Sequence, residues 1–131
     1  MQIYKQFTFE AAHRLPTAPD GHPNSRIHGH SFRVRVVIDG RPDPESGVIF
    51  NFEDLEAAMD VTRLKLDHHY LNEIEGLELP TLERISIWLW NELDPAVPGL
   101  FEIRVARDSC NEGCRYRGPE TQAQGRSKGT D

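Results

Sequence analysis

Hydrophobic and polar residues alternate along two long stretches of the chain, which predicts two half-buried β-strands. In residues 3–13 the large apolar side chains share one parity and most polar ones the other, as in a strand with one face against a core. Residues 27–39 repeat the pattern, with Val and Ile on one face and Arg33 and Arg35 on the other. A shorter alternation at Phe101, Ile103 and Val105 predicts a last strand.

Two other segments carry apolar residues at helical spacing. In residues 52–66 the predicted buried stripe is Phe52, Leu55, Met59 and Leu66, and Asn51 stands where an N-cap is expected. The second predicted helix starts at Pro80 and Thr81. Its buried stripe consists of leucine and isoleucine and ends where Asp94-Pro95 interrupts the helix.

The order of these elements predicts an α+β fold. This order, strand-strand-helix-helix-strand, lacks the βαβ alternation of a parallel sheet. We therefore expect an antiparallel sheet with two helices on one face. Residues 1–118 are predicted to form a single domain. Residues 119–131 contain no large apolar side chain and are predicted to be a disordered tail.

Composition narrows the function classes. The 131 residues carry a net charge of -6, which argues against a nucleic-acid surface, because such a surface needs clustered Lys and Arg. No apolar run approaches the roughly 20 residues of a membrane span, and the first residues do not resemble a signal peptide. We therefore expect a cytoplasmic protein without nucleic-acid or membrane partners, in which Cys110 and Cys114 are reduced.

Three histidines lie on the apolar parity of the two long strands. His28 and His30 are two positions apart, so their side chains point to the same face, and Gly29 between them adds no bulk. His13 ends the preceding strand on its apolar parity. Three neutral imidazoles with an open fourth position are typical of catalytic zinc sites, so we predict that His13, His28 and His30 bind one Zn²⁺.

A second group of candidate residues, Asp67 and His68, follows the first predicted helix directly. A carboxylate beside an imidazole can orient its tautomer and prepare it for proton transfer. An imidazolium at this position can also simply offset the helix dipole, and the sequence leaves both interpretations open.

Five separated motifs together resemble the 6-pyruvoyltetrahydropterin synthase family, and more closely its bacterial 6-carboxytetrahydropterin synthase branch. The match runs from about residue 4 to 118 and consists of FTFEAAHRLP, RIHGHSF, LDHHYLN, PTLE and the acidic residue before SCNEGCRYRG. The resemblance implies the tunnelling fold, with a four-stranded antiparallel sheet whose copies join into a barrel-forming trimer and then a hexamer. It also implies active sites between subunits.

The resemblance also implies roles for individual residues. It places the zinc ligands on His13, His28 and His30, and the family's Asp-His pair on Asp67 and His68. The pterin-binding residues fall on the following three positions: Thr81, Glu83 and Asp108. In the branch that the chain resembles, 7,8-dihydroneopterin triphosphate is converted to 6-carboxy-5,6,7,8-tetrahydropterin, with release of acetaldehyde and triphosphate, in queuosine biosynthesis.

The chain departs from the family pattern at two positions. Asn24 stands where the family has its cysteine base, and an amide cannot accept the proton. Asp108 replaces a glutamate that anchors the pterin. His68, Cys110 or a hydroxide held by the zinc are therefore candidate bases. Three alternative functions stay open: a 6-pyruvoyltetrahydropterin synthase, a retro-aldol enzyme that cleaves the pterin side chain, and a zinc- and pterin-binding protein with little turnover.

Overall fold

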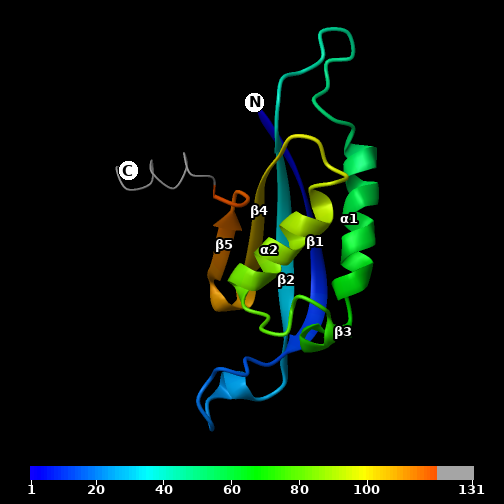
Figure 1. Ribbon diagram of the computed structural model, residues 1–131. Coiled ribbons are helices and arrows are strands. Elements are labelled where there is room, and N and C mark those ends of the chain that lie inside the picture. Colours follow the sequence, from blue (N-terminus) through cyan, green and yellow to red (C-terminus); the bar gives the residue numbers. More distant parts are fainter. Residues whose placement is uncertain (121–131) are drawn as a thin grey trace, which may run out of the picture.

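The computed structural model describes residues 1–120 and contains a five-stranded sheet and two α-helices (Figure 1). The strands lie in the spatial order β3-β1-β2-β4-β5. Their bounds are β1 Gln2–His13, β2 His28–Asp39, β3 His69–Tyr70, β4 Leu100–Arg107 and β5 Glu112–Tyr116. The helices are α1 Phe52–Leu66 and α2 Leu82–Leu93, and three short 3-10 turns join the elements.

The predicted α+β class with two helices is confirmed, but the sheet is mixed and has five strands. Strands β1, β2, β4 and β5 pair antiparallel, whereas β3 pairs parallel with Ala11 and Ala12 of β1. The two residues of β3 are too few to leave an alternation in the sequence. Strand β5 is also short and contains Gly113, and the apolar run Val48–Phe50 forms no strand.

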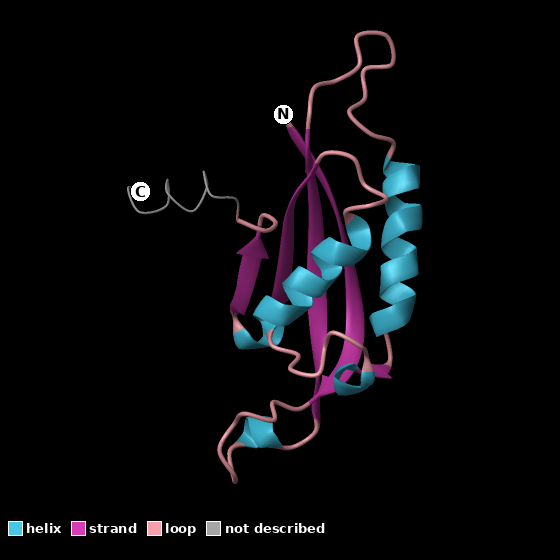
Figure 2. Cartoon of the chain, in the orientation of Figure 1, coloured by secondary structure: helices cyan, strands magenta, loops and turns pink. Residues whose placement is uncertain are grey.

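Both helices cover the same face of the sheet (Figures 1 and 2). The alternating residues of β1, β2 and β4 point into the space beneath the helices, where Phe9 and Phe32 stack with ring centroids 4.8 Å apart. Leu55 and Met59 of α1 and Ile85 of α2 close this core from the other side. Within residues 1–120, the opposite face of the sheet carries no helix, and we call it the open face.

The helix bounds agree with the sequence, but Asn51 and Phe52 do not behave as predicted. Thr81 caps α2, because its hydroxyl accepts a hydrogen bond from the Arg84 amide at 3.2 Å. Asn51 occupies the N-cap position of α1, but its side chain makes no capping hydrogen bond. Phe52 is 49% exposed, so its predicted place in the buried stripe is wrong. The apolar contacts at this end come instead from Ile49 and Phe50.

The predicted tail lies outside the described residues from position 121 onward. Within residues 1–120, neither helix has the length and the apolar character needed to cross a membrane.

Candidate metal centre

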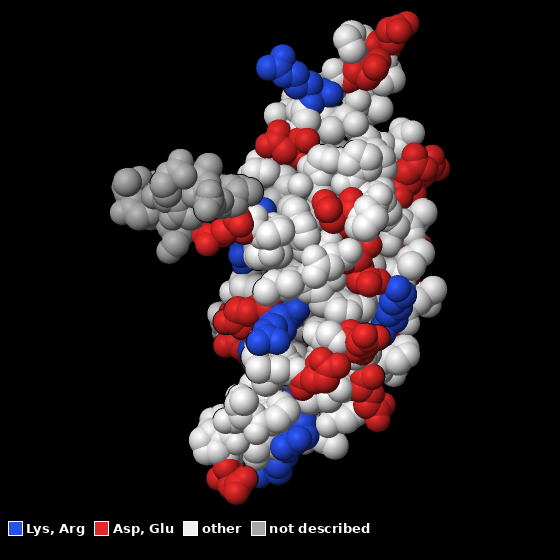
Figure 3. Space-filling model, viewed as in Figure 1, with Lys and Arg blue, Asp and Glu red and all other residues white. Residues whose placement is uncertain are grey.

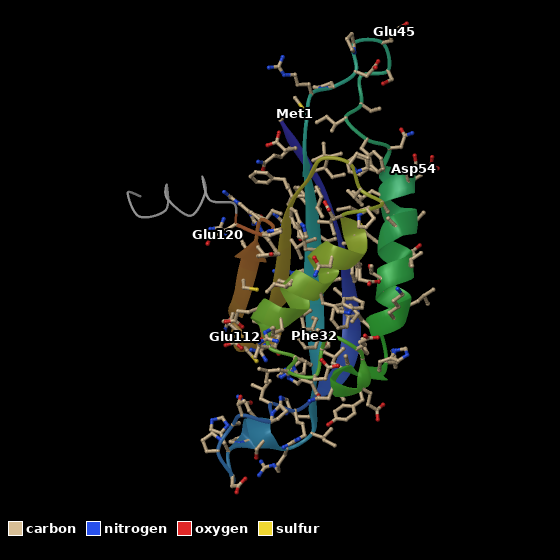
Figure 4. The ribbon with its side chains drawn as sticks, viewed as in Figure 1. Met1, Phe32, Glu45, Asp54, Glu112 and Glu120 are labelled. Atoms are coloured by element: carbon tan, nitrogen blue, oxygen red, sulfur yellow. The ribbon has the colours of Figure 1, made fainter. Side chains whose placement is uncertain are left out.

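The three predicted ligands meet where β1 ends and β2 begins. In the antiparallel pair, His13 lies opposite His28, and Ala11 lies opposite His30. Alternation places all three imidazoles on the helix-covered face, where the rings of His13 and His30 lie next to the ring of Phe32. Figure 4 labels Phe32, which marks this end of the sheet. The two-strand register therefore brings His13 to two histidines that are 15 and 17 residues away in the sequence.

The geometry of the triad suits one ion. One ring nitrogen from each histidine lies within 4.8 Å of the other two. The ring centroids are 4.6 Å apart for His13 and His28, 5.1 Å for His13 and His30, and 4.8 Å for His28 and His30. His13 is 1% exposed, so the group lies at the edge of the core and not on the surface.

The hydrogen bonds of the rings fix which nitrogen is free. His13 Nδ1 contacts the Pro80 carbonyl at 3.0 Å, and His28 Nδ1 contacts the Arg26 carbonyl at 2.8 Å. Because a carbonyl only accepts, each Nδ1 must carry the proton, and the Nε2 lone pair is left free. The Nε2 atoms of His13, His28 and His30 are all buried and have no hydrogen-bond partner among residues 1–120. Each such atom costs about 1–3 kcal/mol unless a ligand satisfies it, so the triad fits a metal ion.

Burial also keeps the rings of His13 and His30 neutral. It lowers the pKa of His13 to about 4, against the opposing effect of the Pro80 hydrogen bond. Burial likewise lowers the pKa of His30, and the nearby Arg107 charge adds to this effect. Neutral imidazole is the form that binds a metal, so His13 and His30 are ready for coordination at neutral pH.

Arg107 is a residue beside the triad that the sequence analysis missed. Its Nε is buried without a partner, while one terminal nitrogen contacts the Glu112 carboxylate. Figure 4 labels Glu112 near the same end of the sheet as Phe32. The alternation of Ile103 and Val105 reaches Arg107 if it is extended by two positions, so the pattern contained a signal for it.

The predicted Asp-His pair is well ordered at the end of α1. The Asp67 carboxylate accepts a hydrogen bond from the Glu10 amide at 2.8 Å and contacts His68 Nδ1 at 3.0 Å. The Glu10 amide is the main cause that lowers the pKa of Asp67, and the bond to His68 and the charge of Arg63 contribute. Asp67 is therefore ionised at neutral pH and can orient the imidazole.

His68 has an unusual backbone and an accessible ring. Its φ is 60°, in the left-handed region that a residue with a Cβ rarely adopts. Its amide donates to the Glu10 carbonyl at 2.6 Å, and its side chain is 79% exposed. Strained residues held by their neighbours are common at functional sites, and nothing in the sequence indicates this strain.

An open pocket of about 660 Å³ is bordered by one residue of each group. It is lined by His30 of the triad, by His68, and by Ser109 after β4. Glu10, Gly29 and Tyr70 complete its wall with their neighbours. His30 and His68 therefore both border this pocket, although its strand residues Glu10, Gly29 and Ser31 belong to the open face and the His30 imidazole lies on the helix-covered face.

The other predicted site residues are more dispersed. Asn24 lies in the turn Pro23–Ser25, where its carbonyl accepts from the Leu15 amide at 2.8 Å. Thr81 follows Pro80, whose carbonyl holds His13, and Glu83 is exposed in the first turn of α2. These contacts place the start of α2 beside the triad, and the predicted substrate roles of Thr81 and Glu83 stay predictions.

Asp108 points away from the triad. Both of its carboxylate oxygens accept from the Arg33 guanidinium at 3.0 Å, and this pairing lowers the pKa of Asp108. Arg33 lies on the open face, because its neighbours Phe32 and Val34 are buried beneath the helices. Within the chain, the predicted pterin anchor therefore lies on the opposite face of the sheet from the metal ligands.

Comparisons with known proteins agree with this geometry. The model of the family described as 6-pyruvoyl tetrahydropterin synthase matches residues 2–119. A Synechocystis protein named 6-carboxy-5,6,7,8-tetrahydropterin synthase is 42% identical, over 89% of this chain and 93% of that protein. A Pyrococcus furiosus protein named dihydroneopterin monophosphate aldolase is 30% identical, over 88% of this chain and 92% of that protein.

A solved structure supports the fold. The 6-pyruvoyl tetrahydropterin synthase of Caenorhabditis elegans superposes with a TM-score of 0.81 at 24% identity, over 91% of this chain and 96% of that chain. The family model, the relatives and the paired strands that carry the histidines all lead to one assignment. The chain belongs to the 6-pyruvoyl tetrahydropterin synthase family.

Proposed function

We propose that this chain is a zinc-dependent lyase that converts 7,8-dihydroneopterin triphosphate to 6-carboxy-5,6,7,8-tetrahydropterin and releases acetaldehyde and triphosphate. The reaction belongs to queuosine biosynthesis, and the name of the 42% identical Synechocystis relative supports it. The observation that carries the proposal is the set of three buried Nε2 atoms without partners at one point of the fold.

The donor set suits zinc. Three neutral imidazoles and one open position are typical of catalytic Zn²⁺ sites. His13, His28 and His30 would hold the ion, and the Pro80 and Arg26 carbonyls fix the tautomers of two of these rings. A bound zinc ion supplies Lewis acidity, which lowers the pKa of an oxygen that contacts it.

Proton transfer is assigned to His68. Its ring is accessible from the pocket that His30 also lines, and the ionised Asp67 holds it by Nδ1. This contact leaves Nε2 to exchange a proton with a bound molecule. Asn24 occupies the position of the family's cysteine but has no group that titrates, so His68 is the base in this proposal.

We assign binding of the pterin ring to Asp108, with Thr81 and Glu83 as the other proposed substrate contacts. A carboxylate that is kept ionised can accept hydrogen bonds from the N–H groups of a pterin. Asp108 has this charge, but Arg33 occupies both of its oxygens. The pterin must therefore compete with Arg33, or bind to an Asp108 whose side chain has turned.

Self-association is part of the proposal, with a trimer and then a hexamer whose sites lie between subunits. Two features of the described chain support it. The sheet has one edge at β5, and at the other edge the two-residue β3 covers only the end of β1. Asp108 and the triad also lie on opposite faces, so a second copy could bring both to one substrate. The proposed location is the cytoplasm, where free thiols such as Cys110 and Cys114 persist.

The main alternative is retro-aldol cleavage of the pterin side chain. Asn24 favours it, because this reaction does not require the same carbon-bound proton to be removed, and the aldolase name of the Pyrococcus furiosus relative adds support. The 6-pyruvoyl reaction and a binding protein with little turnover are the remaining alternatives.

The products separate these alternatives. Full-length protein loaded with zinc is given 7,8-dihydroneopterin triphosphate under anaerobic conditions, and pterins, aldehydes and triphosphate are measured. The proposal expects 6-carboxytetrahydropterin, acetaldehyde and triphosphate. A 6-hydroxymethyl pterin with an aldehyde would establish the aldolase. Triphosphate with a 6-pyruvoyl pterin would establish the 6-pyruvoyl synthase. Binding of the pterin without any product would establish the binding protein.

Asn24→Cys tests the role of the missing cysteine. If His68 is the base, the variant should keep the wild-type products at a similar rate. A rise of about 100-fold, the usual contribution of a positioned base, would contradict this assignment and show that only the cysteine was missing. Asn91→Cys, at an exposed position of α2, is the matched control for an added thiol.

A further inference from the structure

The open face of the sheet concentrates positive charge in a chain whose net charge is -6. Alternation along β2, β4 and β5 directs five guanidinium groups to this face, since the residues between them pack beneath the helices. They belong to Arg33, Arg35, Arg104, Arg115 and Arg117. Figure 3 shows the opposite, helix-covered face, where acidic side chains follow α1.

Three of these arginines stand in one row across three strands. Arg35 of β2 lies directly opposite Arg104 of β4, and Arg104 lies directly opposite Arg115 of β5. Neighbouring strands are about 4.8 Å apart, so the row spans roughly 10 Å. Like charges directly opposite each other destabilise a sheet, and a row of three therefore favours the binding of a compensating anion.

Two arginines of the row, Arg35 and Arg104, are held in place by their neighbours. The Glu102 carboxylate is 2% exposed and accepts from Nε of Arg104 and, at 2.9 Å, from Nε of Arg117. Arg35 donates through Nε to Gln6 at 2.9 Å and lies 4.2 Å above the Tyr4 ring. Guanidinium groups that are already ordered lose less freedom when they bind a ligand.

The carboxylates on this face do not neutralise the whole row. Glu102 is shared between Arg104 and Arg117, and Asp108 pairs with Arg33. Within residues 1–120, neither Arg35 nor Arg115 forms an ion pair with an acidic side chain. A hollow of about 320 Å³ on this face is lined by four of the arginines, Arg33, Arg35, Arg104 and Arg115.

We propose that Arg35, Arg104 and Arg115 form a binding site for a phosphate-bearing polyanion on the open face of the sheet. The planar fork of each guanidinium matches two phosphate oxygens, and a chain of linked phosphates can reach along the row. The site is separate from the histidine triad, which lies on the other face. It does not depend on the proposed lyase activity.

The test is a calorimetric titration of the full-length protein with tripolyphosphate at low ionic strength. Arg35→Gln and Arg115→Gln should each weaken binding by about tenfold or more, because each removes hydrogen bonds to charged groups. Arg41→Gln, an exposed arginine in the loop after β2, is the matched control and should bind like the wild type. Equal affinities for all of these proteins, or no binding by the wild type, would overturn the proposal.

Two further measurements distinguish this anion site from the metal centre and from a subunit interface. Tripolyphosphate can also contact a bound metal, so His28→Ala is titrated as well. Unchanged affinity supports the separate site, and lost affinity would place the anion at the metal and overturn the proposal. The second copy of the chain is the other possible occupant. If Arg35→Gln and Arg115→Gln change the oligomeric mass in light scattering but leave tripolyphosphate binding unchanged, the face is an interface and the anion site is wrong.

Discussion

The polar residues on the two faces of strand β2 differ in burial and in hydrogen bonding. On the helix-covered face, His28 and His30 join His13, and their Nε2 atoms are buried without partners. On the open face, Arg33 and Arg35 meet carboxylate, amide and aromatic groups and remain partly accessible. One face of the strand therefore carries polar atoms without hydrogen-bond partners, and the other face carries polar side chains whose hydrogen bonds are largely made.

Burial accounts for the difference. An unpaired polar atom costs about 1–3 kcal/mol when it is buried, whereas an exposed ion pair contributes about 0–1 kcal/mol. A ligand of the triad should therefore stabilise the folded protein strongly. Changes on the open face should affect stability only slightly, even where they affect binding.

The largest expected effect is the loss of metal from His28→Ala. One of three imidazoles is removed, so the purified variant should contain no stoichiometric zinc by mass spectrometry of the metal. Zinc should also raise the melting temperature of the wild type but not of this variant, since only the folded site binds the ion.

His22→Ala is the control for His28→Ala, because His22 is an exposed histidine outside the triad. It should retain one zinc per chain. Stoichiometric zinc in His28→Ala would contradict the three-histidine site.

Asp67→Asn should give the next largest effect, on turnover. The amide cannot hold the His68 imidazolium as the carboxylate does, so kcat should fall by about 100-fold, while zinc content stays at the wild-type level. Product formation and bound metal are measured on the same samples.

Asp60→Asn makes the same chemical change at an exposed position of α1 and should leave kcat unchanged. If both variants were equally active, Asp67 would serve only to end the helix. A loss of zinc from Asp67→Asn would show instead that the two groups are not independent.

Much of the covered face could be predicted from the sequence, because it depends on local alternation. Parity alone placed His13, His28 and His30 with the buried side of two strands, and their register then brought the rings together. The same argument missed Arg107, since the predicted strand stopped at Val105. It also placed Phe52 in the core, although Ile49 and Phe50 fill that place.

The features that were not predicted depend on contacts between distant segments. Strand β3 exists because His69 and Tyr70 meet the end of β1, and the left-handed backbone of His68 is held by Glu10. The bond between Arg33 and Asp108 joins positions 75 residues apart. Such pairings follow from the folded sheet and leave no periodicity in the sequence.

The two faces should also differ in acid sensitivity. The pKa of His13 is lowered to about 4 in the folded protein, whereas an unfolded histidine titrates near 6.5. Between these values the unfolded chain binds more protons, so the stability of metal-free protein should fall as the pH falls from about 6.5 to about 4. The pKa of Asp108 is lowered by Arg33. The stability that the ionised Asp108 contributes is therefore present above the normal carboxyl pKa of about 4 and is lost only below it.

Urea unfolding of metal-free protein from pH 8 to pH 4 tests this difference. His13→Gln should flatten the decline in stability between pH 6.5 and 4, and His69→Gln, at an exposed position, should not. An unchanged decline in His13→Gln would show that another group titrates in this range.

The smallest expected effect is on the open face, from Arg33→Gln. The side chains of Arg33 and Asp108 are 34% and 66% exposed, so water can replace most of what the ion pair contributes, and unfolding free energy should fall by less than about 1 kcal/mol. Urea unfolding at pH 7 measures the change, with Arg41→Gln as the control for the loss of one exposed charge. A loss of several kcal/mol would mean that the ion pair on the open face stabilises the fold as strongly as a ligand stabilises the helix-covered face. The proposed difference in stability between the two faces would then be wrong. A small loss would leave Arg33 and Asp108 free to separate at little cost, which is the freedom that a pterin needs if it binds to Asp108.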